Sequence, residues 1–297
     1  MELPVSGEPM GRCLIVLCGW FSLFRPIYGA TSTIYAMTTS PLIATTSTTT
    51  FQPVSELPTA PSAGYFAISP DGTTAYFSPG SACAGFCSTI SAMSLSTGKT
   101  LHTYQTAYIM TGGTVILPKA SQLYVASCEY GSGGCAFGFV EIFDIESEQE
   151  LAVISTGGDV VTGLSVASNV ATVYASHQLA YQCTPASCDT PLQTVSIPSD
   201  AVTAIDVATL MPTNSLSTPQ YTAPASALVF GYDRVTGYLL IGSEDCSGCP
   251  SVPGAVVSVD LATLTFGPKI PVPDGFEVNN LAIAGNGATL ALAGSLN

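Results

Sequence analysis

The chain has 297 residues and a net charge of −14, with only six lysines and arginines. A protein that neutralises phosphate groups needs clustered cations, so nucleic acid and anionic membrane surfaces are poor partner candidates. A cation, a neutral glycan or another protein surface remains open. The apolar runs are rich in β-branched residues, and no stretch has the sustained period of an amphipathic helix, so an all-β protein is predicted.

Residues 1–30 have the features of an export signal. Arg12 precedes the apolar residues 13–24, which are followed by Arg25 and by small residues. This apolar stretch is shorter than the roughly 20 residues that span a bilayer, but it suits the core of a signal peptide. We therefore expect a signal peptide over 1–30, with an uncleaved anchor as the alternative. Residues 31–297 are then a single domain that is secreted, periplasmic or on the cell surface, with no membrane span after signal removal.

Four segments repeat one order of predicted strands at intervals of about 50–65 residues. An apolar first strand leads through a turn to a second strand with a tyrosine, and a loop with two cysteines leads to the third and fourth strands. The first strands are predicted at 64–69, 113–118, 162–168 and 226–232, and the second at 74–78, 122–127, 172–176 and 237–243. The third strands end within 92–97, 142–147, 204–209 and 258–263. Four strands per repeat of this length are typical of a β-propeller blade.

Two polar features mark the turns of the repeat. Pro70-Asp71-Gly72 is a strong turn signal between a first and a second strand. Three of the third strands carry an aspartate at the same step, Asp144, Asp206 and Asp260, and an aspartate there commonly accepts turn hydrogen bonds.

The two ends of the chain predict how the ring closes. Residues 33–47 resemble 89–105, which hold a third and a fourth strand, and 278–293 contain a first strand, an Asn286-Gly287 turn and a second strand. Pairing of the N- and C-terminal strands would complete one blade and remove exposed edges. We therefore expect five blades in a monomeric ring. The alternative is a fragment of a six- to eight-bladed propeller.

Residues 69–78 and 118–127, with 142–147 after them, resemble the YVTN-type β-propeller repeat family. The resemblance covers most of 31–297. It implies four-stranded blades, usually seven in a ring. Members include surface and periplasmic proteins as well as relatives described as lactonases.

Eight cysteines outside the signal form four close pairs, each between a second and a third strand. An even number of cysteines in an exported protein predicts disulfides, and the recurrence at one place in the repeat favours pairing within each loop. The spacing Cys246-x-x-Cys249 also occurs in zinc and redox sites, but no second such spacing completes a four-thiolate site. The predicted pairs are Cys83 with Cys87, Cys128 with Cys135, Cys183 with Cys188, and Cys246 with Cys249.

No catalytic residue or metal site is predicted. His102, in a fourth strand, and His177, before a cysteine loop, have no neighbouring partner in sequence and are expected to be ordinary surface histidines. The carboxylates of residues 141–150 are expected to form a solvated acidic edge.

The blade-to-blade connections should emerge on the same face as the cysteine loops, because strands alternate in direction within a blade. These connections contain the candidate ligand residues Tyr108, Asp159, Tyr221, Asp274, Phe276 and Glu277. Aromatic and acidic groups near a channel mouth could hold a sugar or a cation such as Ca²⁺. A binding module for a protein or glycan surface is the favoured function. The alternatives are a propeller hydrolase with channel carboxylates and a purely structural surface repeat.

Overall fold

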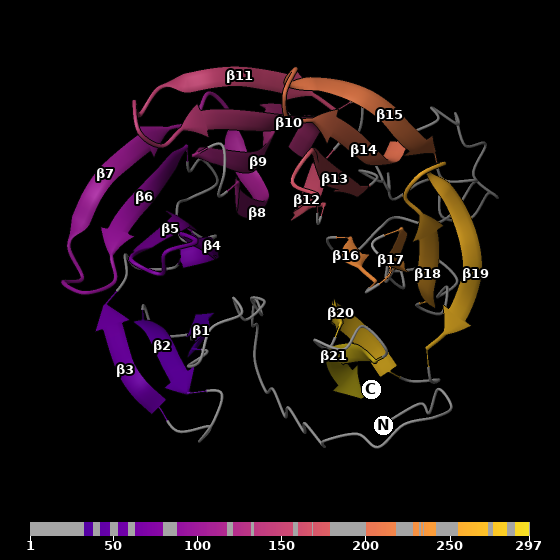
Figure 1. The fold of residues 1–297 in the computed structure, drawn as a ribbon, viewed down its shortest axis with the longest axis horizontal. Coiled ribbons are helices and arrows are strands. Elements are labelled where there is room, and N and C mark those ends of the chain that lie inside the picture. Colours follow the sequence, from indigo (N-terminus) through magenta and orange to yellow (C-terminus); the bar gives the residue numbers. More distant parts are fainter. Residues whose placement is uncertain are drawn as a thin grey trace.

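The computed structural model describes most of the repeat region. The described residues are 33–37, 42–47, 53–58, 63–79, 88–117, 121–131, 134–156, 160–167, 169–178, 200–217, 228–231, 233, 235–241, 255–272, 276–283 and 289–296. Their regular secondary structure is entirely β. Six antiparallel sheets follow one another around a ring (Figure 1).

Four of these sheets have four strands, each in simple up-and-down order. Sheet I consists of β4 (Ala63–Ile68), β5 (Thr74–Pro79), β6 (Thr89–Ser94) and β7 (Thr100–Gln105). Sheet II consists of β8 (Ile109–Leu117), β9 (Gln122–Gly131), β10 (Gly134–Asp144) and β11 (Glu150–Ser155). Sheet III consists of β12 (Val160–Val166), β13 (Thr172–Gln178), β14 (Asp200–Asp206) and β15 (Met211–Ser217). Sheet IV consists of β16 (Val229–Phe230), β17 (Thr236–Ile241), β18 (Ala255–Asp260) and β19 (Thr265–Pro271).

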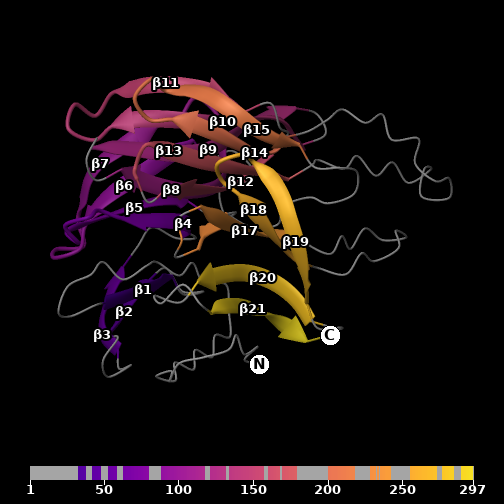
Figure 2. The ribbon, with the colours of Figure 1, turned by 45° about the vertical axis from the view of Figure 1, so that its right-hand side comes forward.

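The remaining two sheets come from the ends of the described chain. The N-terminal sheet consists of β1 (Thr33–Met37), β2 (Leu42–Ser47) and β3 (Pro53–Pro58), and the C-terminal sheet of β20 (Phe276–Ile283) and β21 (Leu290–Leu296). The fourth strands β7, β11, β15 and β19 lie on the outside of the ring, and Figure 2 shows the same sheets after a turn of 45°.

The strand order predicted from the repeat is confirmed in all four complete sheets, and strands are also found within 33–47 and 278–293. Strand β3 was not predicted. In the structure β1 pairs with β2, β2 with β3, and β20 with β21, so the two terminal sheets are separate among the described strands. The composite fifth blade and the closure of the ring therefore remain predictions.

The aspartates at the ends of the third strands cap the turns that follow them, as predicted. The Asp206 carboxylate accepts hydrogen bonds from the backbone N–H of Thr209 at 2.8 Å and from its hydroxyl at 2.8 Å. These hydrogen bonds, that of the hydroxyl first, hold the pKa of Asp206 below its usual value. Asp144 accepts equivalent bonds from Ser147, and Asp260 accepts one from the backbone N–H of Thr263.

The core lies between neighbouring sheets that pack face to face, from sheet I through sheet IV to β20. In three of these interfaces the repeated tyrosine of the second strand is buried against the next sheet: Tyr76 against sheet II, Tyr124 against sheet III and Tyr174 against sheet IV. Leu240 and Val256 of sheet IV pack with Leu281 of β20 in the same way. A series of sheets that each bury one face against the next is the packing of a propeller.

Candidate functional site

The hairpin of β9 and β10 extends beyond its neighbours and carries a disulfide. Cys128 and Cys135 are bonded, with Cα atoms 5.5 Å apart, an ordinary separation for a disulfide. This confirms one of the four predicted pairs. The other three pairs lie outside the described residues. We call the end of the sheets that carries this hairpin the cysteine face.

The tip of this hairpin exposes two aromatic side chains. Phe137 is 59% exposed and Tyr130 is 52% exposed. Phe137 lies directly across from the exposed Glu129 of β9, whereas Tyr130 lies across from Cys135. Because residues that pair across two strands share a face of the sheet, Phe137 and Glu129 lie side by side on one face of the hairpin.

A stacked aromatic pair lies behind Phe137. The ring of Phe139, two residues along β10, stacks on that of Tyr108 with centroids 4.2 Å apart and planes 4° apart. Both side chains are half-buried. Tyr108, which the sequence singled out, belongs to the connection from β7 to β8. The predicted proximity of this connection to the cysteine loops is therefore present in sheet II.

The connection is anchored by a buried carboxylate. Glu141, the next residue but one after Phe139, has no exposed surface and accepts hydrogen bonds from the backbone N–H groups of Ala107 at 2.6 Å and Tyr108 at 3.2 Å. Burial raises the pKa of Glu141, although the Ser127 hydroxyl and the two N–H groups oppose this shift. The geometry of the Ser127 hydroxyl is too poor for a full hydrogen bond to form.

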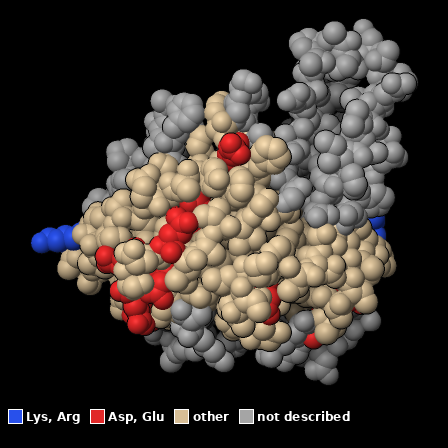
Figure 3. Space-filling model, turned by 90° about the horizontal axis from the view of Figure 1, so that it is seen from above, with Lys and Arg blue, Asp and Glu red and all other residues tan. Residues whose placement is uncertain are grey.

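The predicted solvated acidic edge is thus wrong for Glu141. This residue lies within β10, where its side chain faces sheet I and the connection that follows it. Glu146, Glu148 and Glu150 follow the end of β10 and are exposed, as expected. In Figure 3 acidic side chains gather on one side of the molecule.

A second connection is anchored from the equivalent positions of sheet III. His177 is 1% exposed, and its Nε2 lies 3.0 Å from the hydroxyl of Thr203, which in turn donates to the carbonyl of Thr156 at 2.9 Å. Thr156 begins the connection from β11 to β12. The expectation of a surface histidine is therefore wrong for His177, because its ring fills an interface between two sheets.

The structure describes only some of the other residues that the sequence singled out. Phe276 and Glu277 begin β20, whereas Asp159, Tyr221 and Asp274 lie outside the described residues. His102 lies in the fourth strand β7, as predicted, with Nδ1 2.9 Å from a carboxylate oxygen of Glu148. Phe137, Phe139 and Glu141 were missed, although their alternation F-x-F-x-E after Cys135 was visible in the sequence.

Two features are absent from the described residues. No group of three or more His, Cys, Asp or Glu side chains is arranged there to hold a metal ion. Asp159 and Asp274, two of the acidic residues considered for a cation such as Ca²⁺, lie outside this part of the chain. Nor does that part contain a helix long and apolar enough to cross a membrane.

Comparison with known proteins identifies an architecture and no family. No family model matches the sequence, and no curated protein matches it. Among solved structures 1250 chains match. One is the hydrazine synthase of Kuenenia stuttgartiensis, with a TM-score of 0.67 and 15% sequence identity over 88% of this chain and 70% of the other. At this identity the likeness shows a β-propeller-like fold alone, and a fold shared so widely does not determine an activity.

Proposed function

We propose that this chain is the β-propeller of an exported or cell-envelope protein of the YVTN-type repeat family and that it is a binding module without catalysis. The observation that carries the proposal is the aromatic side of the β9–β10 hairpin. Phe137 is exposed there, Glu129 lies beside it, and the Tyr108–Phe139 stack lies two residues further along β10. A disulfide and a buried carboxylate fix the backbone on which these groups stand.

The chemistry of this surface favours a neutral glycan over other ligands. The C–H groups of a sugar ring pack on an exposed aromatic face, and its hydroxyls donate to an ionised carboxylate. A fixed platform loses little entropy on binding, which favours recognition by a small number of side chains. The net charge of −14 opposes acidic glycans. A protein surface is the other partner class that suits exposed aromatic residues.

The buried Glu141 does not support a hydrolase. A glycosidase needs two acidic side chains about 5–10 Å apart beside the substrate. The carboxylate of Glu141 is instead buried and occupied by two backbone N–H groups, which makes it an anchor of the connection.

Binding can be tested with the full chain on immobilised neutral and acidic glycans. We expect binding to a neutral glycan that Phe137→Ala weakens at least about tenfold. The matched control is Leu101→Ala, because Leu101 is 62% exposed on the outer strand β7 and is remote from the hairpin. Equal binding by the two variants would refute recognition through the hairpin, and binding to acidic glycans alone would refute the ligand class.

Export and disulfide formation can be tested by the intact mass of the mature protein, with thiols alkylated before and after reduction. We expect a chain that begins near residue 31 and exposes eight thiols only after reduction. Free thiols without reduction would contradict the three disulfides proposed beside Cys128–Cys135.

Closure of the ring into five blades is proposed from the incomplete terminal sheets, of which one has three strands and the other two. If the edge of β21 is paired, its outward-facing amides exchange as slowly as the inward-facing amides that bond to β20. Fast exchange at alternate residues of β21 would show an open edge and contradict the closure.

A further inference from the structure

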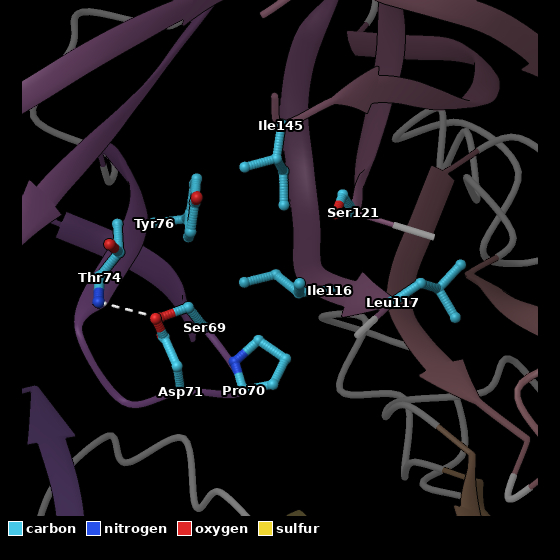
Figure 4. Close-up of a pocket in the computed structure, with 9 residues that line it drawn as sticks. All are labelled: Ser69, Pro70, Asp71, Thr74, Tyr76, Ile116, Leu117, Ser121 and Ile145. Atoms are coloured by element: carbon cyan, nitrogen blue, oxygen red, sulfur yellow. Dashed lines mark hydrogen bonds between the residues drawn. The ribbon is translucent and has the colours of Figure 1, made fainter. Parts of the chain in front are cut away.

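A cavity lies between sheets I and II at the end opposite the cysteine face. Its volume is about 360 Å³, which falls within the range of small-molecule sites. Sheet I lines it with the turn between β4 and β5 and with Tyr76, and sheet II lines it with the ends of its first and third strands (Figure 4). The lining residues are Ser69, Pro70, Asp71, Thr74, Tyr76, Ile116, Leu117, Ser121 and Ile145.

The hydroxyl of Tyr76 has no hydrogen-bond partner among the described residues, although this side chain is only 5% exposed. Burial raises its pKa, so the phenol stays protonated and can donate a hydrogen bond. The side chain is packed between the sheets, but its hydroxyl is not among the fully buried polar atoms and is free to donate to a molecule in the cavity.

The next interface of the ring differs from this one at the phenol. There the equivalent Tyr124 hydroxyl lies 3.0 Å from the side-chain oxygen of Gln122, to which it donates. Gln122 precedes its tyrosine by two residues, and the residue at that step before Tyr76 is Thr74. Threonine is too short to reach the ring hydroxyl. It also stands two residues before Tyr174 and Tyr238, as Thr172 and Thr236, so Gln122 is the exception among the four repeats.

A negative charge lies on the same side of the cavity. The Asp71 carboxylate accepts hydrogen bonds from the hydroxyl groups of Ser69 and Thr73, which lower its pKa, so it is ionised at neutral pH. Asp71 is close enough to Tyr76 for its charge to raise the pKa of the phenol. The opposite wall, which Ile116, Leu117 and Ile145 form, is apolar.

We propose that this cavity binds a small aliphatic amino alcohol. The ammonium group donates to the Asp71 carboxylate, the hydroxyl oxygen accepts from Tyr76, and the methylene groups lie against Ile116 and Ile145. One such ligand satisfies the buried phenol, pairs with the carboxylate and covers the apolar wall. The site is separate from the cysteine face and does not depend on the binding proposed there.

The test is a ligand-detected NMR titration of the full chain at 0.15 M salt with ω-amino alcohols of three to six methylenes, and with the alkylamines of equal length. We expect a length optimum at which the amino alcohol binds about fivefold more tightly than the amine. Tyr76→Phe should abolish this preference while the amine still binds. Asp71→Asn should weaken both ligands about tenfold.

Thr74→Gln is the decisive variant, because it places in sheet I the residue that fills the next interface. It should abolish binding and leave the urea midpoint unchanged or higher, whereas Tyr124→Phe, the matched control, should bind like the wild type. The proposal is overturned if no member of the series binds, if Thr74→Gln binds normally, or if Tyr76→Phe keeps the preference for the amino alcohol.

Discussion

Replacing either of two adjacent glycines of β8 by alanine should change the stability of the fold in opposite directions. A Cβ atom at Gly112 would lie 2.5 Å from the carbonyl oxygen of Val161 on β12 and 2.9 Å from the Cβ of Ala126. A Cβ atom at Gly113 would have no neighbour closer than the backbone nitrogen of Leu164 at 3.8 Å, which is an ordinary contact. The first glycine therefore allows the inner strands of sheets II and III to approach each other, and the second does not.

The size of the effect follows from comparing the two variants. Gly113→Ala should stabilise the fold by about 0.5–1 kcal/mol, because alanine restricts the unfolded chain more than glycine does. Gly112→Ala restricts the unfolded chain by the same amount, but it also overpacks the interface at a cost of about 1–3 kcal/mol. The unfolded-state term cancels in the difference, which should therefore be about 1–3 kcal/mol in favour of Gly113→Ala.

Urea unfolding of the two variants, with disulfides intact, measures this difference. The midpoint should fall for Gly112→Ala and rise or stay constant for Gly113→Ala, with the same dependence on urea concentration. Equal midpoints would show that the inner strands of sheets II and III are farther apart than the structure has them, and would refute the close packing around the channel.

Three further substitutions test the buried carboxylate, a turn and the disulfide. The pKa of Glu141 is raised above its usual 4.5, so its ionisation costs stability, and wild type should lose stability relative to Glu141→Gln as pH rises from about 4 to 7 in urea unfolding. The pKa of Asp206 is lowered from 3.8, so the loss of thermal stability in Asp206→Ala should be full at pH 6 and shrink below pH 3.8. Equal pH dependence of wild type and either variant would contradict these shifts. Replacing Cys128 and Cys135 by serine should cost about 2 kcal/mol of unfolding free energy, and an unchanged urea midpoint would show that this loop is not constrained.

The fold could be predicted because the residues that recur in each repeat have structural roles within their own sheet or turn. Each third-strand aspartate binds the turn that directly follows it, as Asp206 does with Thr209. Each second-strand tyrosine occupies the same layer between two sheets, so it recurs at the blade spacing. Features of this kind are fixed by short-range hydrogen bonds or by one repeated packing position, and both are visible in the sequence.

The candidate site could be predicted only in part, because its polar residues find their partners far along the chain. Glu141 binds backbone N–H groups 34 and 33 residues away, and an alternating acidic sequence does not distinguish a side chain that faces water from one that faces the next sheet. His177 was misplaced for the same reason, since its partner Thr203 lies 26 residues away. Tyr108 could be found because it occupies a connection that the repeat places on the cysteine face.

Equivalent tyrosines of the repeat differ in what satisfies their hydroxyl groups. Tyr76 and Tyr124 occupy equivalent positions, yet the phenol of Tyr124 is satisfied by Gln122 and that of Tyr76 faces a cavity. Three of the four repeats have threonine two residues before the tyrosine, and Gln122 is the exception that gives the phenol of Tyr124 a partner. A fold that only needed to be stable would gain from glutamine at this position, since it would fill the space and satisfy the phenol. With Thr74 the space stays open and the phenol has no partner among the described residues. A ligand, rather than the chain, can then complete the interface.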